Sequence, residues 1–342
     1  MLWRAELQWL GGLVSIASAA AVFFRPQFIG IDVVNTPFAR GEDESFLRGF
    51  RKAVAGFLPA YCVISLVIFI MFAATGTPAG DAFVMALSLT ASGGMVPDAG
   101  GVAAYGTLAI AAAFMAMVLS GVSFVSTAKL LAPRERAFRF RDDRETPLFV
   151  ILVAITGVIL VLSIPGGGLD DYGHALLNAV SLLSTNGVVS GAHPALTPAL
   201  VTAIIGGASI SAAGGIKLIR WLVTFERAGE EIWKLIHPRG VIGRARAVNE
   251  LGVWVHFVAF TIILSSLVLV ITIYGTPLEL SVTTAVAVIS NAGPMIALAP
   301  GDVVDYQIFD PRLRVMLALG MIAGRVEMVV ALAVLSRDFW RA

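Results

Sequence analysis

Three short turns of small residues carry the chemistry that this sequence offers. They are residues 91–95 (ASGGM), 184–188 (STNGV) and 290–294 (SNAGP), and Gly93, Gly187 and Gly293 occupy similar settings in them. Each turn follows a modestly apolar stretch of about a dozen residues, too short to cross a bilayer. Backbone carbonyls exposed at membrane depth are tolerated inside protein or along a water-filled path, where they can replace the water around a cation. The pattern therefore predicts a cation pathway.

For any one of these turns, close helix packing is the simpler reason for a glycine, because small residues are common at membrane-helix contacts. Three such glycines recur roughly every hundred residues, each between a short and a long apolar stretch, which indicates an internal repeat. The short helices would also direct the partial negative charge of their C-terminal ends at the turns. Both features favour the pore interpretation.

A second candidate element lies in the middle of a long apolar stretch, at residues 206–217 (GGASISAAGGIK). Paired glycines at both ends and many small residues weaken a helix. One interpretation is a break in the helix that places a gate beneath the filter turns. The other is a continuous helix with a small-residue packing face, and composition alone leaves the two equal.

Two charged residues, Arg325 and Glu327, fall within the last apolar stretch. Intramembrane charges are costly and usually face a cavity or a partner. Their separation of two residues points them to different helix faces, so we do not expect them to pair. A pore-facing Arg325 would oppose cations, whereas the structural alternative is a bond to a backbone carbonyl of another helix.

The composition excludes several classes of protein. The chain has 342 residues, 58% of them hydrophobic and 14% charged, with a mean hydropathy of +0.87, which is typical of an integral membrane protein. The net charge of +1 and the absence of a basic, aromatic-rich run give no support for nucleic-acid binding. The single cysteine, Cys62, and four scattered histidines offer neither a disulfide nor a metal site, and no enzyme motif is present.

Hydropathy predicts all-α architecture with long apolar helices and three short, re-entrant ones. The long stretches lie near 7–24, 53–75, 104–128, 147–164, 197–224, 249–274 and 313–336. The re-entrant segments lie near 79–95, 171–188 and 277–294. Lys and Arg concentrate near 25–52, 129–144, 220–246 and 337–341, so the positive-inside rule places these loops in the cytoplasm and the three turns toward the outside. The polar stretch 226–249 is either an interfacial helix or a solvated linker.

Several motifs, in the right order, resemble the TrkH/KtrB superfamily of potassium transporters. They are LWRAELQWLGG (2–12), GGASISAAGGIKLIR (206–220), EIWKLIHPR (231–239), SNAGP (290–294), and GMIAGRVE (320–327) with the ending FW (339–340). The resemblance implies helix–pore loop–helix repeats around a pseudo-fourfold ion pathway. It implies an incomplete first repeat and cytoplasmic loop at 1–52, followed by three complete repeats at 53–146, 147–248 and 249–342.

The same resemblance implies the roles of individual residues. It predicts an ion filter lined by Ala91, Ser92, Gly93, Thr185, Asn186, Gly187, Asn291, Ala292 and Gly293. K⁺ would bind the carbonyls of Ser92, Gly93, Thr185, Asn186, Asn291 and Ala292. The gate would comprise Gly206, Gly207, Ser209, Ser211, Gly214, Gly215 and Arg325.

The resemblance also implies the setting. Members conduct K⁺, in some cases with Na⁺, carry no covalent cofactor, form homodimers in the bacterial inner membrane, and bind a TrkA/KtrA-type cytoplasmic nucleotide-binding subunit. The incomplete first repeat would mean either that Met1 is internal to a longer product or that the chain is a degenerate copy. Two other functions remain open. One is a non-conducting membrane scaffold that docks a cytoplasmic partner, and the other is a secondary transporter, against which the lack of inverted halves argues.

Overall fold

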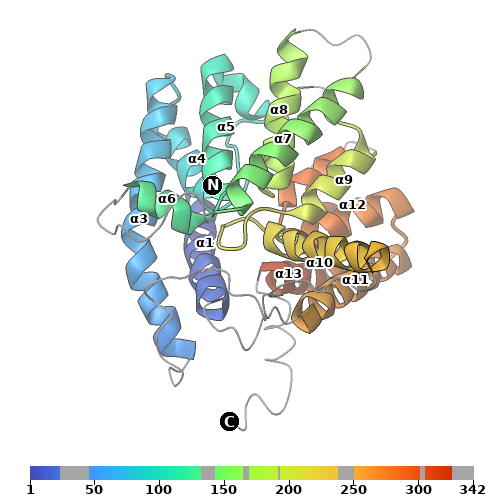
Figure 1. The fold of residues 1–342 in the computed structure, drawn as a ribbon. Coiled ribbons are helices and arrows are strands. Elements are labelled where there is room, and N and C mark those ends of the chain that lie inside the picture. Colours follow the sequence, from blue (N-terminus) through green and yellow to red (C-terminus); the bar gives the residue numbers. More distant parts are fainter. Residues whose placement is uncertain are drawn as a thin grey trace.

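The computed structural model describes residues 1–23, 46–131, 143–164, 169–191, 193–237, 250–300 and 305–325, and these residues form helices and connecting loops (Figure 1). The α-helices are α1 (Leu2–Phe23), α3 (Phe46–Ala74), α4 (Ala79–Thr90), α5 (Thr107–Gly121), α6 (Phe124–Leu131), α7 (Glu145–Leu162), α8 (Leu169–Leu183), α9 (Leu196–Ile205), α10 (Leu218–Ile236), α11 (Glu250–Ile273), α12 (Leu278–Ile289) and α13 (Pro311–Arg325). Short 3₁₀ helices η1 (Gly101–Tyr105), η3 (Gly293–Leu298) and η4 (Tyr306–Ile308) lie in the connections.

The helices follow one order three times: a long helix, a short helix, a turn and an outgoing helix. The long helices α3, α7 and α11 pack against the short helices α4, α8 and α12 that follow them. Helix α1 packs against both α3 and α4. In Figure 1, α3, α5 and α8 stand upright whereas α10 lies crosswise near the middle of the molecule.

The short helices confirm that the three predicted re-entrant segments are helical and end before their turns. Helices α4 and α12 have 12 residues each and α8 has 15. At 1.5 Å per residue, a helix of this length falls well short of the roughly 30 Å hydrocarbon core. Pro78 and Pro277 precede α4 and α12, and Asp81 and Glu279 lie in their first turns, where the helix dipole favours an acidic residue.

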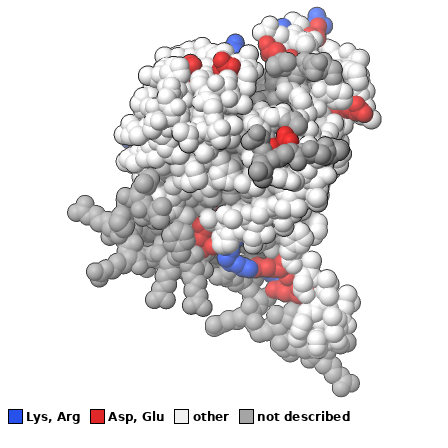
Figure 2. All heavy atoms as spheres, turned by 90° about the horizontal axis from the view of Figure 1, so that it is seen from above, with Lys and Arg blue, Asp and Glu red and all other residues white. Residues whose placement is uncertain are grey.

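The side chains are distributed as in a membrane protein, with apolar groups outside and polar groups inside. Leu66, Val158 and Ile262, on α3, α7 and α11, are more than half exposed. Ser184 and Thr185 are fully buried. By length and composition, three described helices could cross a membrane, at Arg48–Ala74, Glu145–Leu162 and Leu251–Ile273. Seen from above, the described surface is largely uncharged, with acidic and basic side chains at scattered positions (Figure 2).

Two predicted long helices are broken. The expectation of one helix over 104–128 is wrong, because α5 ends at Gly121 and α6 begins at Phe124. The stretch 197–224 divides into α9 and α10 with non-helical backbone at 206–217, so the predicted break is confirmed and the continuous-helix interpretation is excluded. Part of the predicted helix 313–336, Glu327, the ending 339–340 and the segment 238–249 lie outside the described residues.

Candidate functional site

The three turns share one backbone geometry. Ser92, Thr185 and Asn291 all have left-handed backbone angles, with φ of 55°, 55° and 56°. Such values are unusual for residues other than glycine. The residue after each of them donates its amide to the carbonyl five residues earlier, at 2.8, 2.8 and 2.9 Å. This bond ends the helix in the manner of a Schellman motif, and its repetition shows that the turns are structurally equivalent.

This equivalence changes the predicted register of the first turn by one residue. Gly93 corresponds to Asn186 and Ala292, because these three residues make the five-residue bond. Gly94, with φ of 65°, therefore corresponds to Gly187, with φ of 72°, and in position to Gly293, whose φ is not positive. The signal was present in the sequence as S-G-G, T-N-G and N-A-G, in which a polar residue stands two positions before the aligned glycine.

The turns lie against one another through their glycines. A Cβ on Gly94 would collide with the carbonyl oxygen of Asn186 in the second turn. A Cβ on Gly187 would lie 2.6 Å from the carbonyl oxygen of Ala292 in the third turn. Ser92 also donates its hydroxyl to the carbonyl of Ser184 at 2.5 Å. The first turn therefore abuts the second and the second abuts the third, which no single stretch of sequence specifies.

The left-handed positions are those at which the carbonyl oxygen lacks a hydrogen bond in all three turns, among the described residues. Among the described residues, no hydrogen bond reaches the carbonyl oxygen of Ser92, Thr185 or Asn291. Other carbonyls of the turns are engaged, since Ala292 accepts the amide of Met295 at 2.9 Å and Ala91 accepts Arg325. Ser92 and Thr185 are buried, and buried carbonyls are rarely left without a partner, so these positions suit an additional ligand.

Side chains that the sequence did not reveal hold the turns in place. Asn186 donates to the hydroxyl of Ser120 on α5 at 3.1 Å. Tyr306 donates to the carbonyl of Gly293 at 3.1 Å. Gln8 on α1 accepts the hydroxyl of Ser88 at 2.7 Å. These supports come from residues more than ten positions away in the chain, and of the three only Gln8 lies within a motif quoted above.

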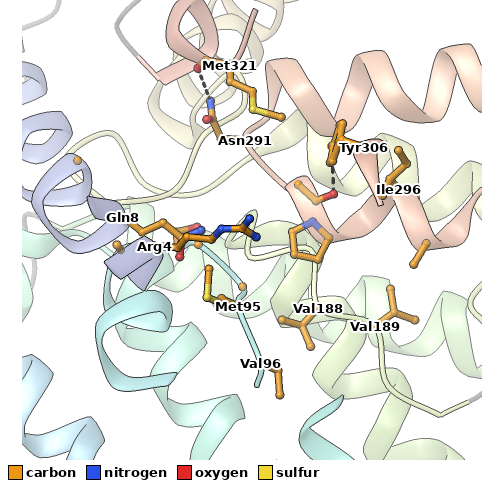
Figure 3. Close-up of a pocket in the computed structure, with 18 of the residues that line it drawn as sticks. Arg4, Gln8, Met95, Val96, Val188, Val189, Asn291, Ile296, Tyr306 and Met321 are labelled. Carbon is orange, nitrogen blue, oxygen red and sulfur yellow. Dashed lines mark hydrogen bonds between the residues drawn. The ribbon is translucent and has the colours of Figure 1, made fainter. Parts of the chain in front are cut away.

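A cavity of about 730 Å³ opens beside the first and third turns (Figure 3). Its lining includes Arg4 and Gln8 of α1, Met321 and Arg325 of α13, and Tyr306. The remaining lining comes largely from the three turns and the segments that follow them. Backbone oxygens and the C-terminal ends of short helices therefore border a hollow that a small hydrated ion could enter.

The interrupted segment 206–217 passes next to the second and third turns. Gly214 donates its amide to the hydroxyl of Thr185 at 2.7 Å, and its Cα lies against the carbonyl of Ser290. Gly206 and Gly215 each have φ of 76° and bring the two ends of the segment together, since a Cβ on Gly215 would lie 2.7 Å from the Cα of Gly206. The structure thus brings the predicted gate residues and filter residues into direct contact.

Arg325 reaches across the molecule to the first turn. Its Nη2 donates to the carbonyl of Ala91, and its Nε donates to the hydroxyl of Ser15 on α1 at 2.9 Å. The structural alternative considered from sequence, a bond to a backbone carbonyl, is therefore present, and that carbonyl belongs to the first of the three turns. The Ala91 carbonyl is occupied by the guanidinium in this arrangement.

The described part of the chain contains no group of three His, Cys, Asp or Glu residues that could hold a metal ion.

Comparison with known proteins shows clear relatives. No protein-family model matches the chain. It is 26% identical over 361 residues to the Trk system potassium uptake protein TrkH of Halomonas elongata, covering 100% of this chain and 73% of that protein. It is 24% identical over 359 residues to TrkI of the same organism (99% and 72%) and to TrkH of Escherichia coli (100% and 74%). The crystal structure of the potassium transporter TrkH from Vibrio parahaemolyticus has the same fold, with a TM-score of 0.80 at 22% identity over 99% of this chain and 72% of that one.

Proposed function

We propose that this chain, a member of the TrkH/TrkG/TrkI family of Trk potassium transporters, takes up potassium by passing it across backbone carbonyls of its three turns. It is a multi-pass membrane protein and not an enzyme, as the sequence predicted. The carbonyl oxygens of Ser92, Thr185 and Asn291 carry the proposal. They lie at equivalent positions and accept no hydrogen bond among the described residues.

Potassium suits these oxygens for a physical reason. An ion that leaves water must exchange its hydration shell for other oxygens, and carbonyls provide them without a fixed charge that would trap the ion. The C-terminal ends of α4, α8 and α12 add partial negative charge at the turns. Of the six carbonyls predicted to bind K⁺, those of Ser92, Thr185 and Asn291 are free of hydrogen bonds in all three turns among the described residues, whereas the set formed by Gly93, Asn186 and Ala292 is not. The Ala292 carbonyl accepts an amide and that of Asn186 lies against Gly94.

The finer architecture is part of the proposal. The turns line three sides of a pseudo-fourfold pathway, and the cavity between the first and third turns, bordered by α1 and α13, is its fourth side. Residues 206–217 act as the gate below the filter. This arrangement is supported by the contact between Gly214 and Thr185, which would transmit movement of the segment to the filter.

Gly187→Arg tests the filter. A side chain at position 187 would project against the carbonyl of Ala292. The substitution should therefore abolish rubidium uptake into proteoliposomes while the protein still inserts in the membrane. Gly49→Arg is the matched control, because a Cβ there meets no atom within 4 Å. Unchanged uptake with Gly187→Arg would refute a filter at this turn.

The alternative function, a scaffold that docks a cytoplasmic partner, has one feature in its favour. The end of α10 exposes Leu235 and Ile236, at 81% and 66% of their surface. We propose that a TrkA/KtrA-type subunit binds there, which is compatible with transport. We also propose that the chain forms a homodimer in the inner membrane. Leu235→Glu should weaken binding of the subunit in a pull-down assay. If the chain is only a scaffold, substitutions in the three turns should have no effect.

A further inference from the structure

The tip of the interrupted segment, residues 207–211, is docked on the break between α5 and α6. The amide of Ala208 donates to the carbonyl of Gly121 at 2.9 Å, and the amide of Phe124 donates to the carbonyl of Ile210 at 2.6 Å. A helix break leaves amides and carbonyls without partners, which is expensive away from water. The tip supplies the partners that the break lacks.

A buried carboxylate reinforces this docking. Glu145, the first residue of α7, is 6% exposed. Its two carboxylate oxygens accept the amide of Ser209 at 3.2 and 3.1 Å, and one of them also accepts the Ser209 hydroxyl at 2.9 Å. These bonds tie the backbone and the side chain of Ser209 to the start of α7.

Glu145 is itself held in a fixed position. Asp143 accepts the amides of Glu145 and Thr146 at 3.1 and 3.0 Å, which caps the start of α7. The second oxygen of Asp143 accepts the hydroxyl of Ser126 on α6. The carboxylate of Glu145 therefore lies at a capped helix end, and Asp143 links this helix end to α6, which begins after the break.

We propose that Glu145 is a positioning residue that latches the tip, so that only the arm that follows, residues 212–215, moves beneath the filter turns. Undocking the tip would leave two backbone pairs and a buried carboxylate without partners. Moving the arm breaks the bond between Gly214 and Thr185 and the bond from Lys217 to the carbonyl of Ala213. The inference rests on the proposed gate for its meaning in transport, but its test does not depend on transport.

The test compares thiol labelling at the tip and at the arm of the full chain in proteoliposomes. Cys62, which is exposed on α3, is first replaced by alanine. Ser211→Cys then reports on the tip and Ala213→Cys on the arm, and both parent residues are almost fully buried, at 2% and 3%. A charged thiol reagent should label the arm faster than the tip. Equal labelling rates at the two positions would overturn the division into a fixed and a moving part.

Glu145→Ala should raise the labelling rate at the tip by about tenfold or more, since it removes the acceptor of both the amide and the hydroxyl of Ser209. Glu279→Gln, which removes a carboxylate from the first turn of α12, is the matched control and should leave the rate unchanged. Ser209→Ala keeps the buried carboxylate and removes one of its donors, so it should give a smaller increase in a protein that retains its fold.

Unchanged labelling of the tip in both Glu145→Ala and Ser209→Ala would refute the latch, whatever happens to transport. Faster labelling with altered rubidium uptake would support both the latch and the gate. Faster labelling with unaltered uptake would uphold the latch and count against the gating role in the proposed function.

Discussion

The sharpest prediction concerns two glycines that the sequence treats alike. Gly187 has φ of 72°, and a Cβ there would lie 2.6 Å from the carbonyl oxygen of Ala292 and 2.9 Å from the amide nitrogen of Met295. At Gly293, which corresponds to it in the third turn, a Cβ meets no atom within 4 Å. Alanine should therefore be severe at the first position and mild at the second.

The magnitude follows from two contributions. A non-glycine residue in the left-handed region costs about 1–2 kcal/mol, and an overpacked methyl against backbone costs about 1–3 kcal/mol. Together, roughly 2–5 kcal/mol would shift the equilibrium away from the native turn by at least about 30-fold at Gly187. At Gly293 the expected penalty is limited to the restriction that the following proline places on its neighbour.

Rubidium uptake by proteoliposomes containing Gly187→Ala or Gly293→Ala measures the difference. Uptake should fall by about tenfold or more in the first variant and change little in the second. Size-exclusion profiles and thermal midpoints establish that both variants are folded. Equal loss of uptake in the two variants, or none in Gly187→Ala, would refute the packing on which the expectation depends.

Two further predictions concern the supports of the site, and a third concerns Tyr105, which donates its hydroxyl to Asp81 of α4 at 2.9 Å. Thr185→Val leaves the buried amide of Gly214 without its acceptor and should lower the free energy of unfolding by about 1–3 kcal/mol. Thr185→Ser keeps the hydroxyl acceptor and should retain that stability, so equal thermal midpoints for the two variants would contradict this prediction. Tyr306→Phe removes the donor to the Gly293 carbonyl and should cost about 0.5–1.5 kcal/mol, seen as a lower thermal midpoint and a reduced preference for K⁺ over Na⁺ in competition uptake. Burial and the hydrogen bond to Asp81 raise the pKa of Tyr105 from 10.0 to about 12. The stability that its neutral phenol provides is therefore fully present below pH 10 and is lost as the pH rises through 12. Tyr105→Phe should remove this decrease from a plot of thermal midpoint against pH.

Much of the fold could be predicted from the sequence because its signals are local. Apolar stretches of different length separated the long helices from α4, α8 and α12, since the bilayer thickness sets a length that a helix must reach. The paired glycines around 206–217 predicted the break between α9 and α10 for a similar local reason. The break at Gly121 was missed because its stretch is continuously apolar. What stabilises that break is the tip of another segment, which hydropathy does not reveal.

The candidate site likewise has features that the sequence predicted and features that only the tertiary structure established. By itself, the sequence determined that three glycine-containing turns end short helices in a membrane protein, and its motifs gave a resemblance to Trk potassium transporters that the full-length similarity supports. Only the tertiary structure decided that Gly94 stands in register with Gly187, that the carbonyls of Ser92, Thr185 and Asn291 accept no bond among the described residues, and that Glu145 holds Ser209. Hydropathy and helix length depend on a residue's near neighbours. Which carbonyl is left free, and which carboxylate meets which amide, depend on residues that come together only when the helices pack.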